Sequence, residues 1–179
     1  DGKRVVGAFA REQDTSQIET EEENKDSIPE QLKDKVTKGL DLNKVRASNK
    51  FTDEGRFLRT YRWDTTISGI EKRYSLEPGL LAGLIMKESY GNPLELNSGA
   101  DGGAGLLMFQ PGTARQFGLK IYSNSRASGR DRNHGPKLRE LVRTKNYDYS
   151  KLIKADERFD VIKATDAAAR YLRQEFNQH

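Results

Sequence analysis

The stretch from residue 78 to residue 105 constrains the fold of this chain most, because a strongly apolar helical pattern there ends on a carboxylate and runs into a Gly-rich loop. Pro78 suits the first turn of a helix over residues 78–89. Helical spacing places on one face Leu81, Leu84, Ile85 and Glu88. The Glu88 carboxylate is therefore expected to point the same way as the residues that form the core.

Glu88 has two interpretations at this point. A carboxylate on a buried helix face is costly when ionised, so burial favours the protonated form. That environment is typical of a Glu that works as a general acid near neutral pH. The alternative is a Glu at a helix end that turns to solvent or pairs with Lys87 or Arg115. Periodicity alone leaves both interpretations open.

The loop after this helix is rich in glycine, a residue that lets a backbone approach a ligand closely. The glycines gather between Ser98 and Gly105. Because the loop lacks both the Lys of a phosphate-binding P-loop and a preceding strand, the pattern predicts no phosphate site. A further short helix is expected from Thr113 to Phe117, with Gly118 as its natural end.

Several motifs follow one another through this part of the chain. They are Glu88-Ser89, Asn92-Pro93, Gly105-Leu106 and Pro111-Gly112-Thr113-Ala114, continued by the segments 115–120, 156–160 and 167–172. This order resembles the lytic transglycosylases, which share a goose-type-lysozyme-like domain, and the later segments are most similar to the membrane-bound lytic transglycosylase D branch. The resemblance covers residues 64–120 and 155–176. It implies a mainly α, lysozyme-like domain of the transglycosylase SLT type.

The resemblance also implies cleavage of the β-1,4 glycosidic bond between N-acetylmuramic acid and N-acetylglucosamine in peptidoglycan. The Glu that matches Glu88 is the single catalytic acid and base of that family. It protonates the glycosidic oxygen and then takes a proton from the muramic 6-hydroxyl, which leaves a 1,6-anhydro end. One carboxylate suffices because the nucleophile belongs to the substrate. No metal and no cofactor is implied.

The chain departs from the family pattern at the sugar groove. Family members usually read Gly-Leu-Met-Gln or Gly-Leu-Trp-Gln, and the Gln helps to line the groove. Here Met108 stands at the position of that Gln, and Gln110 stands where a Met or Ile usually precedes the Pro. Met108 could be core filler, which is the commoner role of Met, or the exchange could alter which sugar is accepted.

Two further carboxylates, Glu95 and Asp101, lie in the loop between Glu88 and Gly105. Asp101 falls at the offset from Glu88 at which goose-type lysozymes carry an Asp that places a hydrolytic water. An inverting hydrolase needs its carboxyl groups about 6.5–9.5 Å apart, so a lysozyme that uses Glu88 and Asp101 is the rival within the enzyme class. Asp101 could instead make local turn hydrogen bonds. Either carboxylate could also meet the ammonium group of a de-N-acetylated glycan.

The predicted substrate-binding residues surround Glu88. They are Ser89, Tyr90, Glu95, Ser98, Gly105, Met108, Gln110 and Tyr171. Family members continue past the last helix into an Ala-Tyr-Asn-x-Gly segment that this sequence does not show before His179. Three alternatives follow: the sequence is cut before that segment, Tyr90 or Tyr171 replaces the phenol, or the site is degenerate.

The sequence predicts three parts along the chain. Residues 1–26 form an acidic tail with too little apolar surface to order itself, and residues 27–55 form a bracing helix and a linker. Residues 56–179 form the lysozyme-like domain. Its segment 121–155 is a basic insertion relative to the family, with a short helix expected after Pro136. This insertion is either a flap over the groove or a solvated surface helix.

Composition bounds the remaining choices. The 179 residues carry a net charge of +4 and no Cys, which excludes disulfides and thiolate chemistry. No apolar run approaches the ~18 residues of a membrane-spanning helix, and the chain begins at Asp1 without a leader pattern. The absence of Cys fits an exported as well as a cytosolic protein, so the expected location rests on the function that the resemblance implies, which is action on peptidoglycan in the periplasm or outside the cell. We also expect a monomer without a nucleic-acid partner. The rival from another class is a non-catalytic peptidoglycan-binding module. Nucleic-acid binding is the weakest option, because no series of stacking aromatic residues accompanies the basic insertion.

Overall fold

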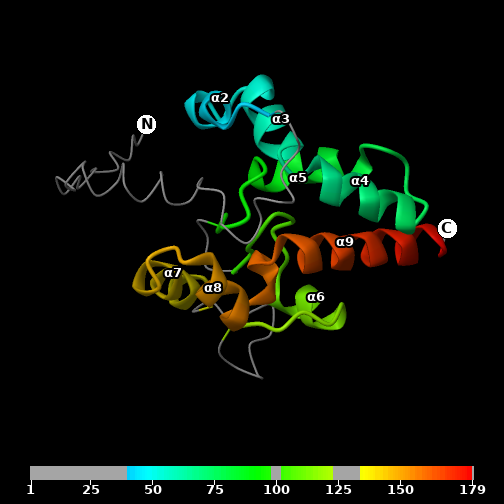
Figure 1. Cartoon of the computed structure of the whole chain (residues 1–179). Coiled ribbons are helices and arrows are strands. Elements are labelled where there is room, and N and C mark those ends of the chain that lie inside the picture. Colours follow the sequence, from blue (N-terminus) through cyan, green and yellow to red (C-terminus); the bar gives the residue numbers. More distant parts are fainter. Residues whose placement is uncertain (1–39, 98–101, 123–133, 179) are drawn as a thin grey trace, which may run out of the picture.

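The computed structural model describes residues 40–97, 102–122 and 134–178, and the statements below concern these residues. They form eight α-helices and one short 3-10 helix (Figure 1). In chain order these are α2 (Leu42–Ala47), α3 (Asp53–Tyr61), α4 (Asp64–Arg73), α5 (Leu80–Ser89), α6 (Pro111–Gln116), α7 (His134–Thr144), α8 (Tyr149–Ala155), η2 (Glu157–Phe159) and α9 (Val161–Phe176). The mainly α fold predicted from the sequence is confirmed. The acidic tail and the bracing helix lie outside the described residues, apart from the end of the latter.

The longest described helix, α9, runs through the middle of the molecule (Figure 1). It begins after Asp160, whose side chain accepts hydrogen bonds from the backbone N–H groups of Ile162 and Lys163. Its buried face is built largely from small residues such as Ala164 and Ala168. Small side chains let neighbouring helices approach, and α4 and α5 both pack against α9. The two regions of the family resemblance, far apart in the sequence, therefore meet in one structure.

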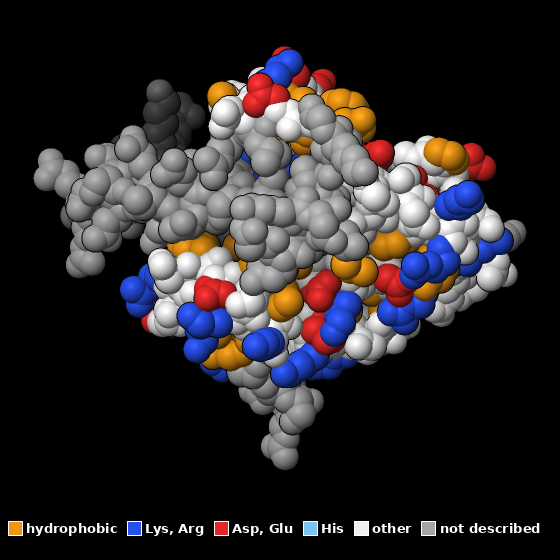
Figure 2. All heavy atoms as spheres, viewed as in Figure 1, with side chains coloured by type: hydrophobic (Ala, Val, Ile, Leu, Met, Phe, Trp, Pro, Cys, Tyr) orange, Lys and Arg blue, Asp and Glu red, His pale blue; other side chains and the backbone are white. Residues whose placement is uncertain are grey.

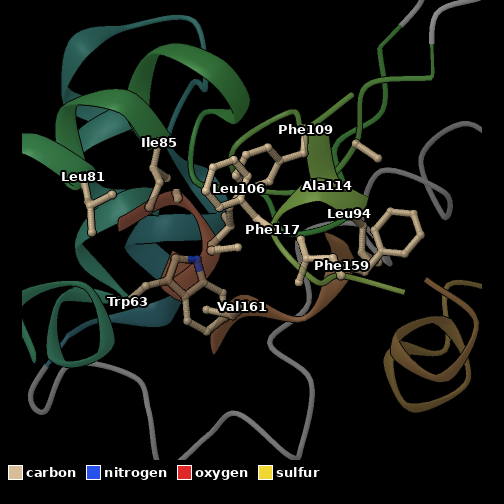
Figure 3. Packing of buried hydrophobic residues seen from close by; sticks show 14 of the residues in the cluster. Trp63, Leu81, Ile85, Leu94, Leu106, Phe109, Ala114, Phe117, Phe159 and Val161 are labelled. Atoms are coloured by element: carbon tan, nitrogen blue, oxygen red, sulfur yellow. The ribbon is translucent and has the colours of Figure 1, made fainter. Parts of the chain in front are cut away.

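The core combines side chains from these helices. Trp63, Leu81, Ile85 and Leu106 are fully buried, as is Val161 at the start of α9. Figure 3 shows these residues directed into one cluster from several helices and from the loop before α6. Burying side chains of this size supplies most of the stabilisation of a small domain. The cluster also fixes one face of α5, the helix that carries Glu88.

The described part of the basic insertion belongs to this core as well. Leu138, Leu141 and Val142 of α7 are buried, and so is Leu152 of α8. Helix α7 is therefore a core-packed helix rather than a solvated surface helix. The flap interpretation depends on the start of the insertion, and residues 123–133 lie outside the described residues.

Helix α3 begins within the segment for which the sequence predicts a linker. The Thr52 hydroxyl accepts a hydrogen bond of 3.1 Å from the Gly55 N–H and so caps the first turn. Gly55 also packs so tightly against the Asn49 carbonyl that a Cβ atom at Gly55 would lie 1.8 Å from its oxygen. The predicted boundary between residues 55 and 56 falls inside this helix.

The N-terminal end of α5 is capped by a residue from another helix. Its own N-cap is Gly79, which has no side chain to offer. Instead the buried carboxylate of Glu71 in α4 accepts hydrogen bonds from the N–H groups of Gly79 (2.9 Å) and Leu81 (2.8 Å). A negative charge at this end of a helix also interacts favourably with the helix dipole. A tertiary contact thus replaces the missing local cap.

The C-terminal end of α5 is held through Gly91. The Gly91 carbonyl accepts hydrogen bonds from Arg62 Nη2 (3.1 Å) and Trp63 Nε1 (2.9 Å). Gly91 adopts a φ of +76°, and a Cβ atom there would lie 2.5 Å from the carbonyl carbon of Arg59. Burial, with a further contribution from the positive charge of Arg59, lowers the pKa of Arg62 to about 9. Both ends of α5, and with them Glu88, are therefore fixed by long-range contacts.

We expect Glu71→Gln to lower the free energy of unfolding by about 1.5–3 kcal/mol, because an uncharged amide loses a charge-assisted acceptor and turns an NH₂ group toward a backbone N–H. Urea unfolding followed by circular dichroism measures this change. Glu77→Gln alters an exposed side chain in the same connection and is the matched control. An unchanged unfolding midpoint for Glu71→Gln would show that this cap does not stabilise α5.

Candidate active site

A pocket of about 320 Å³ lies beside the end of α5. Its walls come from α5, from the loop before α6, from α6 and from α9. The lining residues are Leu84, Glu88, Leu107, Phe109, Gln110, Thr113, Ala168, Tyr171 and Leu172. Most of them are apolar, and a mostly apolar pocket with a few convergent polar groups is the usual form of a small-molecule or substrate site.

Glu88 is the next-to-last residue of α5 and is half-buried. It lines the pocket together with Leu84, one helical turn earlier. Leu81 and Ile85, which the sequence places on the same face, are fully buried in the core instead. The apolar face of α5 is therefore shared between core and pocket, and Glu88 lies on the pocket side. It shares the pocket with both apolar and polar side chains.

Gln110 and Tyr171 are the two predicted binding residues that line the pocket with Glu88. Gln110 immediately precedes α6, in extended backbone conformation. Tyr171 lies on α9, is 38% exposed and packs edge-on against Phe117 with the ring centroids 5.5 Å apart. The pocket therefore brings together a carboxylate, an amide and a phenol from three separate elements.

The sequence interpretation missed several lining residues. Thr113 is part of the Pro-Gly-Thr-Ala motif, so the motif itself pointed to it. Ala168 precedes Tyr171 by three residues and Leu172 by four, a helical spacing that identifies a face but not what the face meets. Leu107 and Phe109 lie on either side of Met108, and alternation along this short loop could have suggested them.

Ser89 and Tyr90 do not line the pocket. Ser89 is fully buried, and its hydroxyl donates a hydrogen bond of 3.2 Å to the Ile85 carbonyl one turn earlier. Tyr90 ends α5 in the left-handed region, with a φ of 55°. Its ring lies 5.7 Å from that of Phe51, edge to face, and the Arg56 guanidinium lies 5.0 Å from its centroid. Of the two tyrosines considered for the missing phenol, Tyr171 is the one beside Glu88.

Glu95, Gly105 and Met108 also take other positions. The Glu95 carboxylate accepts a hydrogen bond of 3.0 Å from the Asn92 side chain. Met108 adopts a φ of +48° in a turn closed by its own N–H and the Gly105 carbonyl at 3.1 Å. Gly105 approaches the Arg158 backbone, with a φ of +77°, and not a ligand. The remaining predicted residues, Ser98 and Asp101, lie outside the described residues.

Contacts of Asp166 join α9 to the C-terminal end of α4. The Asp166 carboxylate accepts hydrogen bonds from Tyr74 (2.9 Å) and Arg170 (3.1 Å) and pairs with Arg73 (3.4 Å). Burial, followed by the hydrogen bond to Asp166, raises the pKa of Tyr74. Figure 2 shows Lys and Arg side chains interspersed with Asp and Glu on the face in view. These contacts help to set the position of α9, and therefore of Tyr171.

The described residues offer neither a cluster of metal ligands nor a helix that could span a membrane. This part of the chain brings together no group of three or more His, Asp or Glu side chains that could hold a metal ion. Among the same residues, no helix is long and apolar enough to cross a bilayer.

Comparison with known proteins agrees with this geometry. Residues 65–136 match the family model of the transglycosylase SLT domain. Over 58 residues the chain is 40% identical to a protein named "Transglycosylase" from Enterobacteria phage PRD1, a match that covers 32% of this chain and 21% of that protein. The chain thus spans about a fifth of the length of this relative.

No solved structure matches the chain significantly. The matched segment 65–136 holds Glu88, Gln110 and Thr113, whereas the lining residues of α9 lie beyond it. Neither comparison distinguishes a branch within the family. The chain is therefore similar to the transglycosylase SLT domain over residues 65–136 and to the phage transglycosylase over 58 residues.

Proposed function

We propose that this chain cleaves the β-1,4 bond between N-acetylmuramic acid and N-acetylglucosamine in peptidoglycan, with Glu88 as both acid and base. The observation that carries the proposal is the position of Glu88 in a mostly apolar pocket, inside the segment that matches the transglycosylase SLT domain. The helix that presents this carboxylate is fixed at both ends, by Glu71 and by Gly91. A rigid support of this kind is what acid–base catalysis requires.

The proposed reaction needs one carboxyl group. Protonated Glu88 donates its proton to the glycosidic oxygen as the bond from that oxygen to C1 of the muramic acid breaks. The Glu88 carboxylate then accepts the proton of the muramic 6-hydroxyl as its oxygen bonds to C1. A 1,6-anhydro end forms, Glu88 is protonated again and no water is consumed.

The polar lining residues are suited to hold the sugar. Gln110 offers an amide, which can both donate to and accept from an acetamido group. Thr113 offers a hydroxyl, and Tyr171 offers a partly exposed ring with a polar tip. Gln110 thus supplies an amide to the pocket although Met108 occupies the family position of the Gln.

Lysozyme-like hydrolysis is the second reaction considered for the same site. It needs another carboxylate about 6.5–9.5 Å from the first, with a water between them. Among the described residues, Glu88 is the carboxylate that lines this pocket, and Glu95 is bonded to Asn92. The match to the transglycosylase SLT domain supports the transglycosylase reaction, and the role of Asp101, which lies outside the described residues, stays a prediction.

We expect a digest of purified sacculi to release muropeptides with 1,6-anhydro ends, identified by mass spectrometry as lighter by one water than the reducing products. Reducing ends in their place would assign the hydrolase reaction. Sedimentation of the protein with sacculi, with no released product, would support the non-catalytic binding module instead.

The finer assignments complete the proposal. The resemblance to the D branch, action in the periplasm or outside the cell, and a monomeric state stay predictions from the sequence. A preference for de-N-acetylated glycan also stays a prediction, and the contact between Glu95 and Asn92 does not favour it. Parallel digests of acetylated and de-N-acetylated sacculi test that preference directly.

A further inference from the structure

We propose that Arg158, held by Asp156, is a positioning residue that sets one wall of the pocket that Glu88 lines. It does so by fixing the loop from Gly102 to Gln110, hereafter the wall loop. Leu107, Phe109 and Gln110 of this loop line the pocket, whereas Arg158 lies in η2 and does not. The inference rests on the proposed function, because it concerns how the same pocket binds its glycan.

Arg158 and Asp156 form an ion pair that is completely shielded from solvent. Asp156 is 0% exposed and Arg158 is 1% exposed. The pair is bidentate, with Nε to Oδ1 at 2.9 Å and Nη2 to Oδ2 at 2.7 Å. Because taking two charges out of water costs about as much as their attraction returns, a buried pair is weak as a source of stability. We therefore assign to the pair a role in orienting the groups that Arg158 contacts.

The other guanidinium donors reach two further parts of the chain. Nη1 donates to the backbone oxygens of Gly102 and of Phe109, the latter at 3.0 Å. Nη2 lies 2.8 Å from Nε2 of the buried His134 at the start of α7. With the two bonds to Asp156, these contacts engage all the N–H groups that an arginine side chain offers. Arg158 therefore joins the wall loop, α7 and η2 at one point.

The backbone of Arg158 also packs against the wall loop. Gly105, in the middle of the wall loop, approaches so closely that a Cβ atom there would lie 1.9 Å from the Arg158 carbonyl oxygen. The loop is thus held at Gly102, Gly105 and Phe109 by one residue. Gln110 follows Phe109 directly, so the place of its amide depends on these contacts. Glu88 does not depend on them, since α5 is held by Glu71 and Gly91.

Arg158→Lys separates this role from charge neutralisation. Lys keeps a positive charge beside Asp156, but its compact ammonium has three donors and cannot reproduce the planar fork. The variant therefore loses the hydrogen bonds to the Gly102 and Phe109 carbonyls but keeps the ion pair with Asp156. We expect the KM for a soluble peptidoglycan tetrasaccharide to rise at least about tenfold, with a smaller fall in kcat, because glycan contacts weaken while Glu88 stays in place. Arg143→Lys, on an exposed arginine paired with Glu140, is the control.

The same comparison is made for binding in a catalytically inactive background. Glu88→Gln with Arg158→Lys should bind the tetrasaccharide at least about tenfold more weakly than Glu88→Gln alone, by isothermal titration calorimetry. Equal dissociation constants for the two proteins would overturn the positioning role. If neither wild type nor Glu88→Gln binds or cleaves the glycan, the proposed function itself fails, which is a separate outcome.

His134 provides the test if Arg158→Lys does not fold. His134→Gln keeps an acceptor for Arg158 Nη2 and should retain a KM close to that of wild type. His134→Leu leaves that donor without its acceptor and should raise the KM several-fold. The same KM for both variants would contradict the inference, because a purely structural role predicts no dependence on the acceptor.

Discussion

Glu88→Gln will lower the rate of fragment release from sacculi by about 10²–10⁴-fold, because the amide can neither donate the catalytic proton nor accept one. The side chain keeps its size, and α5 is anchored at both ends by contacts that do not involve Glu88. The variant should therefore fold as wild type does and still sediment with sacculi. Soluble muropeptides are quantified by chromatography with mass detection.

The control for this experiment is Glu140→Gln, which neutralises an exposed carboxylate on α7. It should release product at the wild-type rate. A Glu88→Gln protein that releases product as fast as wild type would remove the pocket from consideration as a catalytic site. Loss of product with retained sedimentation would exclude a module that only binds the wall.

The second large effect is expected for stability. We expect Gly105→Ala to cost about 2–5 kcal/mol of unfolding free energy, because a left-handed backbone strains an alanine by about 1–2 kcal/mol and overpacking costs about 1–3 kcal/mol more. The overpacking arises because a Cβ atom at Gly105 would lie 1.9 Å from the Arg158 carbonyl oxygen. In a marginally stable domain such a loss leaves a large unfolded fraction.

Gly118→Ala is a matched control for Gly105→Ala. Gly118 has a φ of +80°, close to the +77° of Gly105, but a Cβ atom there would meet no atom within 4 Å. Gly118→Ala should therefore cost only the backbone strain, about 1–2 kcal/mol. Denaturant unfolding of both variants measures the difference. Equal costs would mean that the wall loop can move away from Arg158, and that Arg158 does not fix it.

Much of the local structure was readable from the sequence. The apolar spacing around Leu81 and Ile85 predicted α5, and Gly118 marked the end of α6. The Glu88-Ser89 motif and its successors pointed to the chemistry through their order along the chain alone. These signals are local, because helical periodicity, caps and glycine turns are properties of neighbouring residues.

Local signals do not show where long-range contacts place a side chain. Neither Ser89 nor Tyr90 lines the pocket with Glu88, because Ser89 contacts Ile85 and Tyr90 contacts Phe51, and their role in substrate binding stays a prediction. The glycines between Ser98 and Gly105 suggested a loop that approaches a ligand. Gly105 instead packs against the Arg158 backbone, which leaves no room for a Cβ atom. The basic residues of the segment 134–155 are compatible with a solvated surface helix, but its apolar residues complete the core.

The sequence by itself determined that this chain forms amphipathic helices around one carboxylate, with motifs of the lytic transglycosylases. The tertiary structure alone decided what surrounds that carboxylate. It divided the apolar face of α5 between core and pocket, brought Tyr171 of α9 beside Glu88, and placed Glu71 and Arg158 where they fix α5 and the wall loop. The physical reason is that periodicity reports which face of a helix is apolar, whereas only packing determines which partner covers it.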